Sequence, residues 1–232
     1  GLICGWMIHS KDGSPMKAGP HPALAQVTDN LSFALMGLGQ PEEAEPLSRL
    51  ALSMKRQLYG DVHPETAAGL NNLAYVLESR GNLADAELAY REALEVNRKL
   101  LGESHPTNAL TLSNLAFVRY AKGDHAAAVE LLRESLDMTR KVLGPEHPDV
   151  AGRATSLAYW LTDAGEYDEA AQLIDESLAI RSKALGPEHP QFAGALTVKA
   201  NLMLATKRYP QALALASESA RILGKTMTPE QW

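Results

Sequence analysis

The six residues Leu-Gly-Pro-Glu-His-Pro stand at positions 143–148 and again at 185–190. The closing dipeptide His-Pro recurs along most of the chain, and each copy lies 42 residues after the one before it. Its histidines are His21, His63, His105, His147 and His189. A constant spacing without insertions indicates one structural repeat stacked on itself five times, because repeats of this length bury their apolar faces against their neighbours.

Further positions are fixed within the 42-residue repeat. In the second copy, Pro64 suits the first position of a helix, and apolar residues at 70, 73, 74 and 77 follow a helical period. Gly81 favours a left-handed stop, and a second helix then runs to Leu101-Gly102. Lys207 replaces this glycine in the last copy. Each repeat is therefore predicted to be a pair of helices. Alanine occupies one position in every copy, at Ala44, Ala86, Ala128, Ala170 and Ala212.

The run Leu70-Asn71-Asn72-Leu73-Ala74, followed by Gly81 and Ala86, resembles a tetratricopeptide repeat. The 42-residue period and the Leu-Gly-Pro-Glu-His-Pro segments are similar to the long repeats of kinesin light chains. This resemblance implies an all-α, right-handed superhelical solenoid of about five helical hairpins. We expect a tail over residues 1–20, either disordered or of vector origin. The expected repeats are 21–62, 63–104, 105–146, 147–188 and 189–232.

Composition excludes several classes of function. Lys and Arg number 22 against 28 Asp and Glu, which argues against nucleic acid as a partner, because phosphate binding needs clustered basic charge. No run of apolar residues is long enough to span a membrane, so we expect no membrane partner. The single cysteine, Cys4, rules out a disulfide framework and suits the reducing environment of the cytoplasm.

The five histidines do not predict a metal site. Copies in a solenoid are displaced by a whole helical pair, so these side chains form a row, whereas a zinc site gathers its ligands around one ion. The sequence also carries no glycine-rich phosphate loop, no G-x-S-x-G turn and no H-E-x-x-H helix. We therefore expect no cofactor, no metal and no enzymatic activity.

The family resemblance implies that the first helix of each repeat lines a concave groove that holds an extended peptide. One position on these helices is aromatic in four copies, and a position three residues earlier is asparagine in three copies. An amide can donate to and accept from peptide backbone, and aromatic rings offer contact area with little entropy to lose. The alternative is that the asparagines bond a neighbouring helix and the rings fill gaps between repeats. The candidate peptide-binding residues are Asn30, Phe33, Asn72, Tyr75, Asn114, Phe117, Tyr120 and Tyr159.

The expected groove positions carry no Lys or Arg; among them are Asp29, Glu78 and Asp163. Tetratricopeptide repeats that capture acidic chaperone tails have basic residues at these groove positions. Kinesin light chains are similar in using basic residues to bind acidic motifs. This sequence departs from both, so we expect a protein or peptide partner with an apolar or basic extended segment. The predicted function is a non-catalytic, cytoplasmic adaptor or scaffold. Two alternatives remain: a regulatory segment of a larger signalling protein that hydrolyses nucleotides, which the non-Met start keeps open, and a self-assembling structural array.

Overall fold

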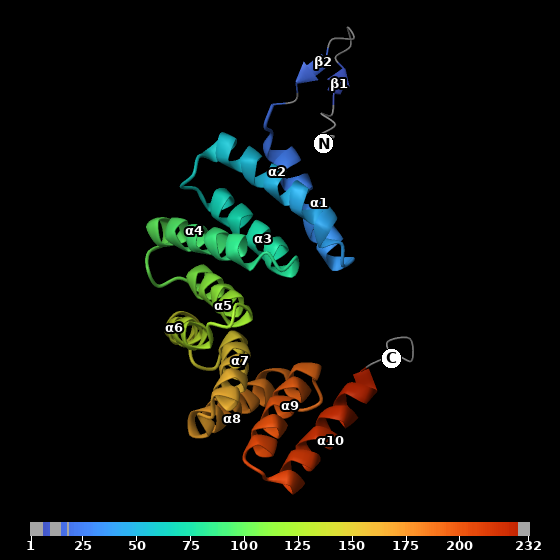
Figure 1. The fold of residues 1–232 in the computed structure, drawn as a ribbon, viewed down its shortest axis with the longest axis vertical. Coiled ribbons are helices and arrows are strands. Elements are labelled where there is room, and N and C mark those ends of the chain that lie inside the picture. Colours follow the sequence, from blue (N-terminus) through green and yellow to red (C-terminus); the bar gives the residue numbers. More distant parts are fainter. Residues whose placement is uncertain (1–6, 10–14, 18, 227–232) are drawn as a thin grey trace. The chain divides into compact units, whose positions relative to one another are not determined.

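The computed structural model describes residues 7–9, 15–17 and 19–226. Two short antiparallel strands, β1 (Met7–His9) and β2 (Pro15–Lys17), precede the helices (Figure 1). Cys4, most of the expected 1–20 tail and the C-terminal residues 227–232 lie outside the described residues. The first helices of the repeats are α1 (Pro22–Gly37), α3 (Pro64–Ser79), α5 (Pro106–Ala121), α7 (Pro148–Ala164) and α9 (Pro190–Ala205). The second helices are α2 (Pro41–Tyr59), α4 (Leu83–Leu101), α6 (His125–Leu143), α8 (Tyr167–Leu185) and α10 (Tyr209–Thr226).

The chain divides into two compact units, residues 1–102 and 103–232, which we call the first and the second unit. In the first unit the hairpin α1–α2 packs through α2 against the hairpin α3–α4. In the second unit the hairpins α5–α6, α7–α8 and α9–α10 pack in succession. The prediction of an all-α solenoid of helical hairpins is confirmed. No helix in the described part of the chain is both long and apolar enough to cross a membrane.

The repeated His-Pro dipeptides start the first helices. In each copy the proline occupies the first turn and the histidine is the N-cap residue. The histidine Nδ1 accepts a hydrogen bond from the backbone N–H two residues later, at 3.1–3.2 Å. This bond satisfies one of the backbone donors that a helix N-terminus leaves without an intrahelical partner. The histidines therefore have a local structural task in every repeat.

The turn between the two helices of each hairpin needs a left-handed residue. The glycines at 39, 81, 123 and 165 have φ between 70° and 84°, a region that glycine enters without steric penalty. In the last hairpin the turn persists although glycine is missing, because Lys207 adopts φ 60°. Lys207 is the one non-glycine residue with positive φ in the described ranges, and a side chain in this region is strained.

Small side chains allow the paired helices to approach closely. Ala44, Ala86, Ala128 and Ala170 are completely buried, and Ala212 is nearly so. In the second unit each hairpin also has a serine hydroxyl that donates from the second helix to a carbonyl of the first. These bonds are Ser135 Oγ to Ala109 O at 2.5 Å, Ser177 Oγ to Ala151 O at 2.9 Å and Ser219 Oγ to Ala193 O at 2.8 Å. The buried alanines and these bonds fix the first helix of a hairpin against its second helix.

Candidate peptide-binding surface

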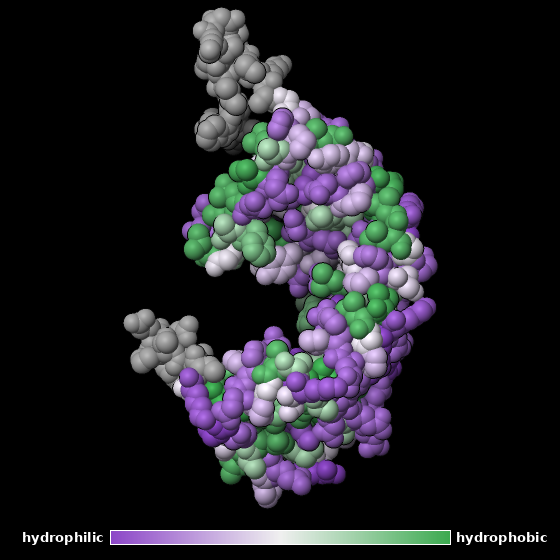
Figure 2. Space-filling view, turned by 180° about the vertical axis from the view of Figure 1, so that it is seen from behind, coloured by the Kyte–Doolittle hydropathy of each residue, from purple (hydrophilic) through white to green (hydrophobic). Residues whose placement is uncertain are grey.

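The four aromatic residues of the expected groove all reach the surface of the first helices. Phe33 and Tyr75 in the first unit are 75% and 49% exposed, and Phe117 and Tyr159 in the second unit are 41% and 40% exposed. Large rings exposed at the same position of successive repeats are available for contact with another molecule. On the face that Figure 2 shows, apolar side chains occur as separate patches among hydrophilic ones.

Three rings of the second unit form an aromatic cluster, which we define as Phe117, Tyr120 and Trp160. Tyr120 on α5 stacks on Trp160 of α7 with 4.6 Å between ring centroids and 9° between planes. Phe117 meets the same indole edge-on at 5.0 Å. Trp160 is 4% exposed, so it is the buried base on which the half-buried Tyr120 and the exposed Phe117 rest. The rings thus join α5 to α7 and also leave apolar area open.

A carboxylate lies beside this cluster. The Tyr120 hydroxyl donates to Asp163 Oδ2 at 2.9 Å, and Asp163 is exposed near the end of α7. Partial burial together with this bond to Asp163 raises the pKa of Tyr120 to about 12. The hydroxyl is therefore a permanent donor at neutral pH, and it fixes one oxygen of Asp163.

The three asparagines differ in their surroundings. Asn30 is exposed and accepts a bond from Gln26 Nε2 of the same helix at 2.9 Å. Exposed Asn72 and half-buried Asn114 have no side-chain hydrogen bond within the described residues. Bonding to a neighbouring helix, the alternative role for these amides, is not their role in this structure. The side-chain donors and acceptors of Asn72 and Asn114 are available to a partner.

In the first unit the carboxylate near Tyr75 is that of Glu78, which is partly buried, whereas Asp163 is exposed. Glu78, one turn after Tyr75 on α3, accepts a bond from the Tyr90 hydroxyl of α4 at 3.2 Å. Burial of Glu78 raises the pKa of its carboxyl above the ordinary value, although the bond from Tyr90 opposes this. Burial, with the neighbouring Glu78, also raises the pKa of Tyr90 far above its ordinary value. Glu78 is thus drawn inward and binds within its own hairpin.

One row of expected groove positions is wrongly placed by the sequence argument. Asp29 is buried, and its Oδ2 accepts from Lys55 Nζ of α2 at 2.5 Å. The corresponding Thr155 and Thr197 hydroxyls contact Ser177 and Ser219 at 2.7 and 2.9 Å. These side chains face the second helix of their own hairpin, because the helical turn carries this position from the outer face to the inner one. They hold the hairpin together and are not part of the candidate surface.

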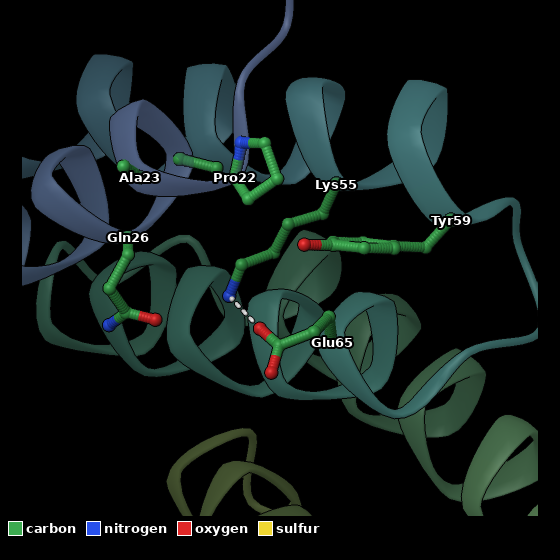
Figure 3. Close-up of a pocket in the computed structure, with 7 residues that line it drawn as sticks. Pro22, Ala23, Gln26, Lys55, Tyr59 and Glu65 are labelled. Atoms are coloured by element: carbon green, nitrogen blue, oxygen red, sulfur yellow. Dashed lines mark ion pairs between the residues drawn. The ribbon is translucent and has the colours of Figure 1, made fainter.

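A cavity of about 290 Å³ lies in the first unit between α1, α2 and α3 (Figure 3). Lys55 and Glu65 are the charged residues that line it, and the Lys55 ammonium lies 3.3 Å from Glu65 Oε2. The same ammonium also contacts Asp29. The positive charge is therefore already compensated from two sides, and the cavity offers no strong anion site. The other lining residues are Pro22, Ala23, Ala25, Gln26 and Tyr59.

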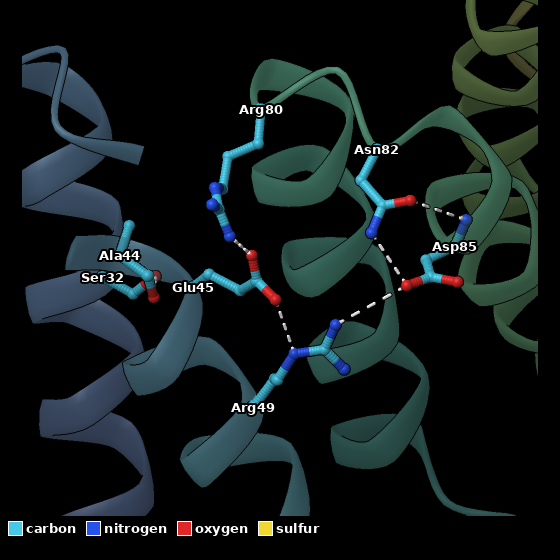
Figure 4. Close-up of polar contacts among 7 residues, drawn as sticks. All are labelled: Ser32, Ala44, Glu45, Arg49, Arg80, Asn82 and Asp85. Atoms are coloured by element: carbon cyan, nitrogen blue, oxygen red, sulfur yellow. Dashed lines mark hydrogen bonds and ion pairs between the residues drawn. The ribbon is translucent and has the colours of Figure 1, made fainter. Parts of the chain in front are cut away.

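The second helices of the first unit carry a network of paired charges (Figure 4). Glu45 on α2 contacts Arg49 at 2.7 Å and also Arg80 of the neighbouring hairpin, and Arg49 lies 3.8 Å from Asp85 of α4. Burial of Glu45 opposes ionisation, but the bonds from Arg49 and Arg80 hold its pKa below the ordinary value. Arg56 and Glu92 form a similar link from α2 to α4 at 2.5 Å. These charges are compensated within the protein.

Sequence reasoning missed the role of Trp160. The equivalent positions in the other repeats hold Ala34, Val76, Val118 and Leu202, so the tryptophan breaks the pattern without a repeated signal. Trp160 directly follows Tyr159, and Phe117 and Tyr120 stand at nearby positions of the previous repeat. This is the one sequence signal that aromatic rings of α5 and α7 form a cluster. No group of three or more His, Cys, Asp or Glu that could hold a metal ion occurs in the described portion of the chain.

Comparison with known proteins agrees with this geometry. Profiles of the family described as Tetratricopeptide repeat match residues 23–99, 108–149 and 150–191. The chain therefore belongs to the tetratricopeptide-repeat family. Within that class its repeats are of the kinesin light chain-like kind.

Solved structures support the assignment. The chain is similar to the nearly identical TPR-like repeats of a kinesin light chain from Podosopora anserina, with 26% identity, a TM-score of 0.75, and coverage of 89% of this chain and 98% of that chain. It also shares its fold with BtubC (BKLC) from P. vanneervenii, with 21% identity, a TM-score of 0.77, and coverage of 89% and 83% of the two chains. A comparison with curated proteins gives no match.

Proposed function

We propose that this repeat protein is a non-catalytic adaptor that binds an extended peptide segment through the first helices of its repeats. An aromatic ring is exposed at the same helix position in both hairpins of the first unit and in the first two hairpins of the second unit. This exposure is the observation on which the proposal rests. Tetratricopeptide repeats as a class mediate protein–protein interactions, and the proposal assigns that interaction to one face.

The chemistry of this face supports a peptide ligand. The amides of Asn72 and Asn114 each offer donors and an acceptor that no other described residue uses, so they can pair with the main chain of a bound segment. On each of these helices an exposed ring lies one turn after the amide: Tyr75 follows Asn72 on α3, and Phe117 follows Asn114 on α5. Aromatic side chains dominate the energetics of many interfaces. Alternation of backbone-binding amides and rings suits an extended segment of varied sequence.

The charge of the first helices supports an apolar or basic segment. Helices α1 and α3 carry no Lys or Arg. In the second unit, Arg119, Arg153 and Lys199 on the first helices each contact an acidic residue: Asp124 at 2.7 Å, Asp149 at 3.7 Å and Asp175 at 2.6 Å. No uncompensated positive charge on the described first helices is therefore available for an acidic ligand. The proposed setting is the cytoplasm, which the single cysteine supports.

A binding measurement with matched tyrosine variants tests the proposal. A random decapeptide library is displayed to the protein, and the enriched peptides are synthesised with a fluorescent label for anisotropy titration. Tyr159→Ala should weaken binding by roughly tenfold, because a central aromatic truncation typically removes more than about 1 kcal/mol. The control is Tyr167→Ala, since Tyr167 is exposed to a similar extent, 38%, but lies on the second helix α8.

Equal affinities of the two variants would contradict the proposed location of the site. Failure of every decapeptide to bind the wild-type chain would contradict the peptide-binding function itself.

A further inference from the structure

Asp163 differs from the other charged residues on the first helices of the second unit. The helices α5, α7 and α9 carry five charged side chains, namely Arg119, Asp149, Arg153, Asp163 and Lys199. Four of them have a partner of opposite charge within 4 Å. Asp163 has none among the described residues, although ion pairs are frequent on the remainder of this unit.

The surroundings of Asp163 leave one side of its carboxylate open. The Tyr120 hydroxyl holds Oδ2 at 2.9 Å, and Oδ1 has no hydrogen-bond partner within the described residues. Tyr159 precedes Asp163 by four residues on α7, so the two side chains are neighbours on one face of the helix. An exposed ring and an exposed carboxylate with a free acceptor thus lie together.

Both groups attract the same kind of ligand atom. A carboxylate pairs with a cation, and the face of a tyrosine ring attracts a cation through its quadrupole. The Trp160 base supports the arrangement, because it fixes Tyr120 and Tyr120 in turn fixes the carboxylate. The ring of Tyr120 also meets the His125 ring of α6, with 4.5 Å between ring centroids and 77° between planes, and Arg119 is held by Asp124.

We infer that Tyr159, Asp163 and the Tyr120 hydroxyl form a recognition site for an arginine side chain of the bound peptide. The inference rests on the proposed peptide-binding function and adds the residue that this part of the surface selects. Arginine fits better than lysine because its planar guanidinium can stack on a ring while its N–H groups donate to a carboxylate at the edge. A lysine ammonium is a compact, strongly hydrated charge that cannot stack.

Among the five described repeats the site occurs once. The positions equivalent to Asp163 are Gly37, Ser79, Ala121 and Ala205, none of which is ionisable. In the first unit the carboxylate of Glu78 is drawn to Tyr90 and does not take this place. The inference therefore implies one preferred arginine per bound segment.

Selection from the random decapeptide library tests this inference. The wild-type chain, Asp163→Asn and the control Asp137→Asn are compared; the control removes the same charge from the second helix α6, where Asp137 pairs with Arg140. Asparagine keeps an acceptor for the Tyr120 hydroxyl, and Asp163 is exposed, so the fold is retained. Circular dichroism of both variants verifies this.

We expect wild type and Asp137→Asn to enrich arginine at one peptide position, and Asp163→Asn to lose that enrichment while still binding peptides. Replacement of the selected arginine by citrulline, which is neutral and similar in shape, should weaken binding to wild type roughly tenfold and leave Asp163→Asn nearly unaffected. Lysine in its place should restore only part of the affinity.

Two results would overturn the inference. Peptides that bind without any preference for arginine would refute the arginine site and leave the proposed function standing. The same arginine preference in Asp163→Asn as in wild type would assign it to other residues. A wild-type chain that binds no decapeptide would reject both the inference and the proposed function.

Discussion

Replacement of Trp160 by alanine is the most informative perturbation of the second unit. The indole is 4% exposed and contacts two rings of the preceding repeat, Tyr120 at 4.6 Å and Phe117 at 5.0 Å. Its removal leaves a cavity between α5 and α7 that backbone shifts can close only in part. Truncation of a buried tryptophan or phenylalanine typically lowers the free energy of unfolding by about 3–5 kcal/mol.

The upper half of this range is expected here. Stacked and edge-on ring pairs contribute about 0.5–1.5 kcal/mol beyond the area they bury, and Trp160 takes part in one pair of each kind. A stability of about 5–15 kcal/mol is usual for a domain, so the variant should retain its helices but unfold at a much lower denaturant concentration. The companion Trp160→Phe keeps a ring on the same base and should lose less, about 1–3 kcal/mol.

Urea unfolding followed by far-UV circular dichroism measures the effect, since this signal does not depend on tryptophan. Tyr209→Ala is the control, because Tyr209 is 59% exposed and its removal should change stability by less than about 0.5 kcal/mol. A loss below about 1 kcal/mol in Trp160→Ala would refute the interpretation of Trp160 as the base of the aromatic cluster. The arginine preference of the bound peptide should disappear together with the cluster.

Three further predictions concern the caps, the turns and the pH dependence. His105→Ala should lower the free energy of unfolding by about 1 kcal/mol and His105→Asn by less, because asparagine can still accept the bond from Thr107 N; equal losses in urea unfolding would contradict the capping role. Lys207→Gly should raise the melting temperature, by relief of about 1 kcal/mol of strain at φ 60°, whereas an unchanged or lower value would show that this turn is not strained. Because the pKa of Glu78 is raised, the folded chain binds the proton of this carboxyl more tightly than the unfolded chain does. The stability that this proton contributes is present at low pH and is lost as the pH rises from the ordinary carboxyl pKa through the raised pKa of the folded state. Glu78→Gln should therefore gain stability relative to wild type as the pH rises from about 4 to about 7, and a gap in melting temperature that does not change with pH would contradict the buried carboxylate.

Periodicity predicted the fold well because the structural requirements of the turns recur in every repeat. His63-Pro64 and Gly81 each meet a local need, a helix start and a left-handed turn, and such needs can be recognised without knowledge of distant contacts. The same reasoning explains Lys207: the stack imposes the turn even where the preferred glycine is missing.

The candidate surface was predicted less completely, because exposure depends on how a helix rotates against its neighbours. The position of Phe117 and Tyr159 was recognised from repetition, and both rings are exposed. The adjacent position of Asp29 was assigned to the groove, but the rotation of about 100° between successive helical residues turns it inward to Lys55. The contact between Tyr120 and Trp160 joins residues of two repeats and has no equivalent in the other copies, so periodicity carried no signal for it.

We propose that partners bind the first helices of the repeats and not the second helices. Photo-cross-linking tests it directly, with a benzoyl-phenylalanine side chain introduced in place of Tyr159, Phe117 or Tyr167 and a labelled decapeptide from the library selection as the ligand. We expect cross-links from positions 159 and 117 and none above background from position 167, which lies on α8. Efficient cross-linking from position 167, with none from the other two, would contradict it.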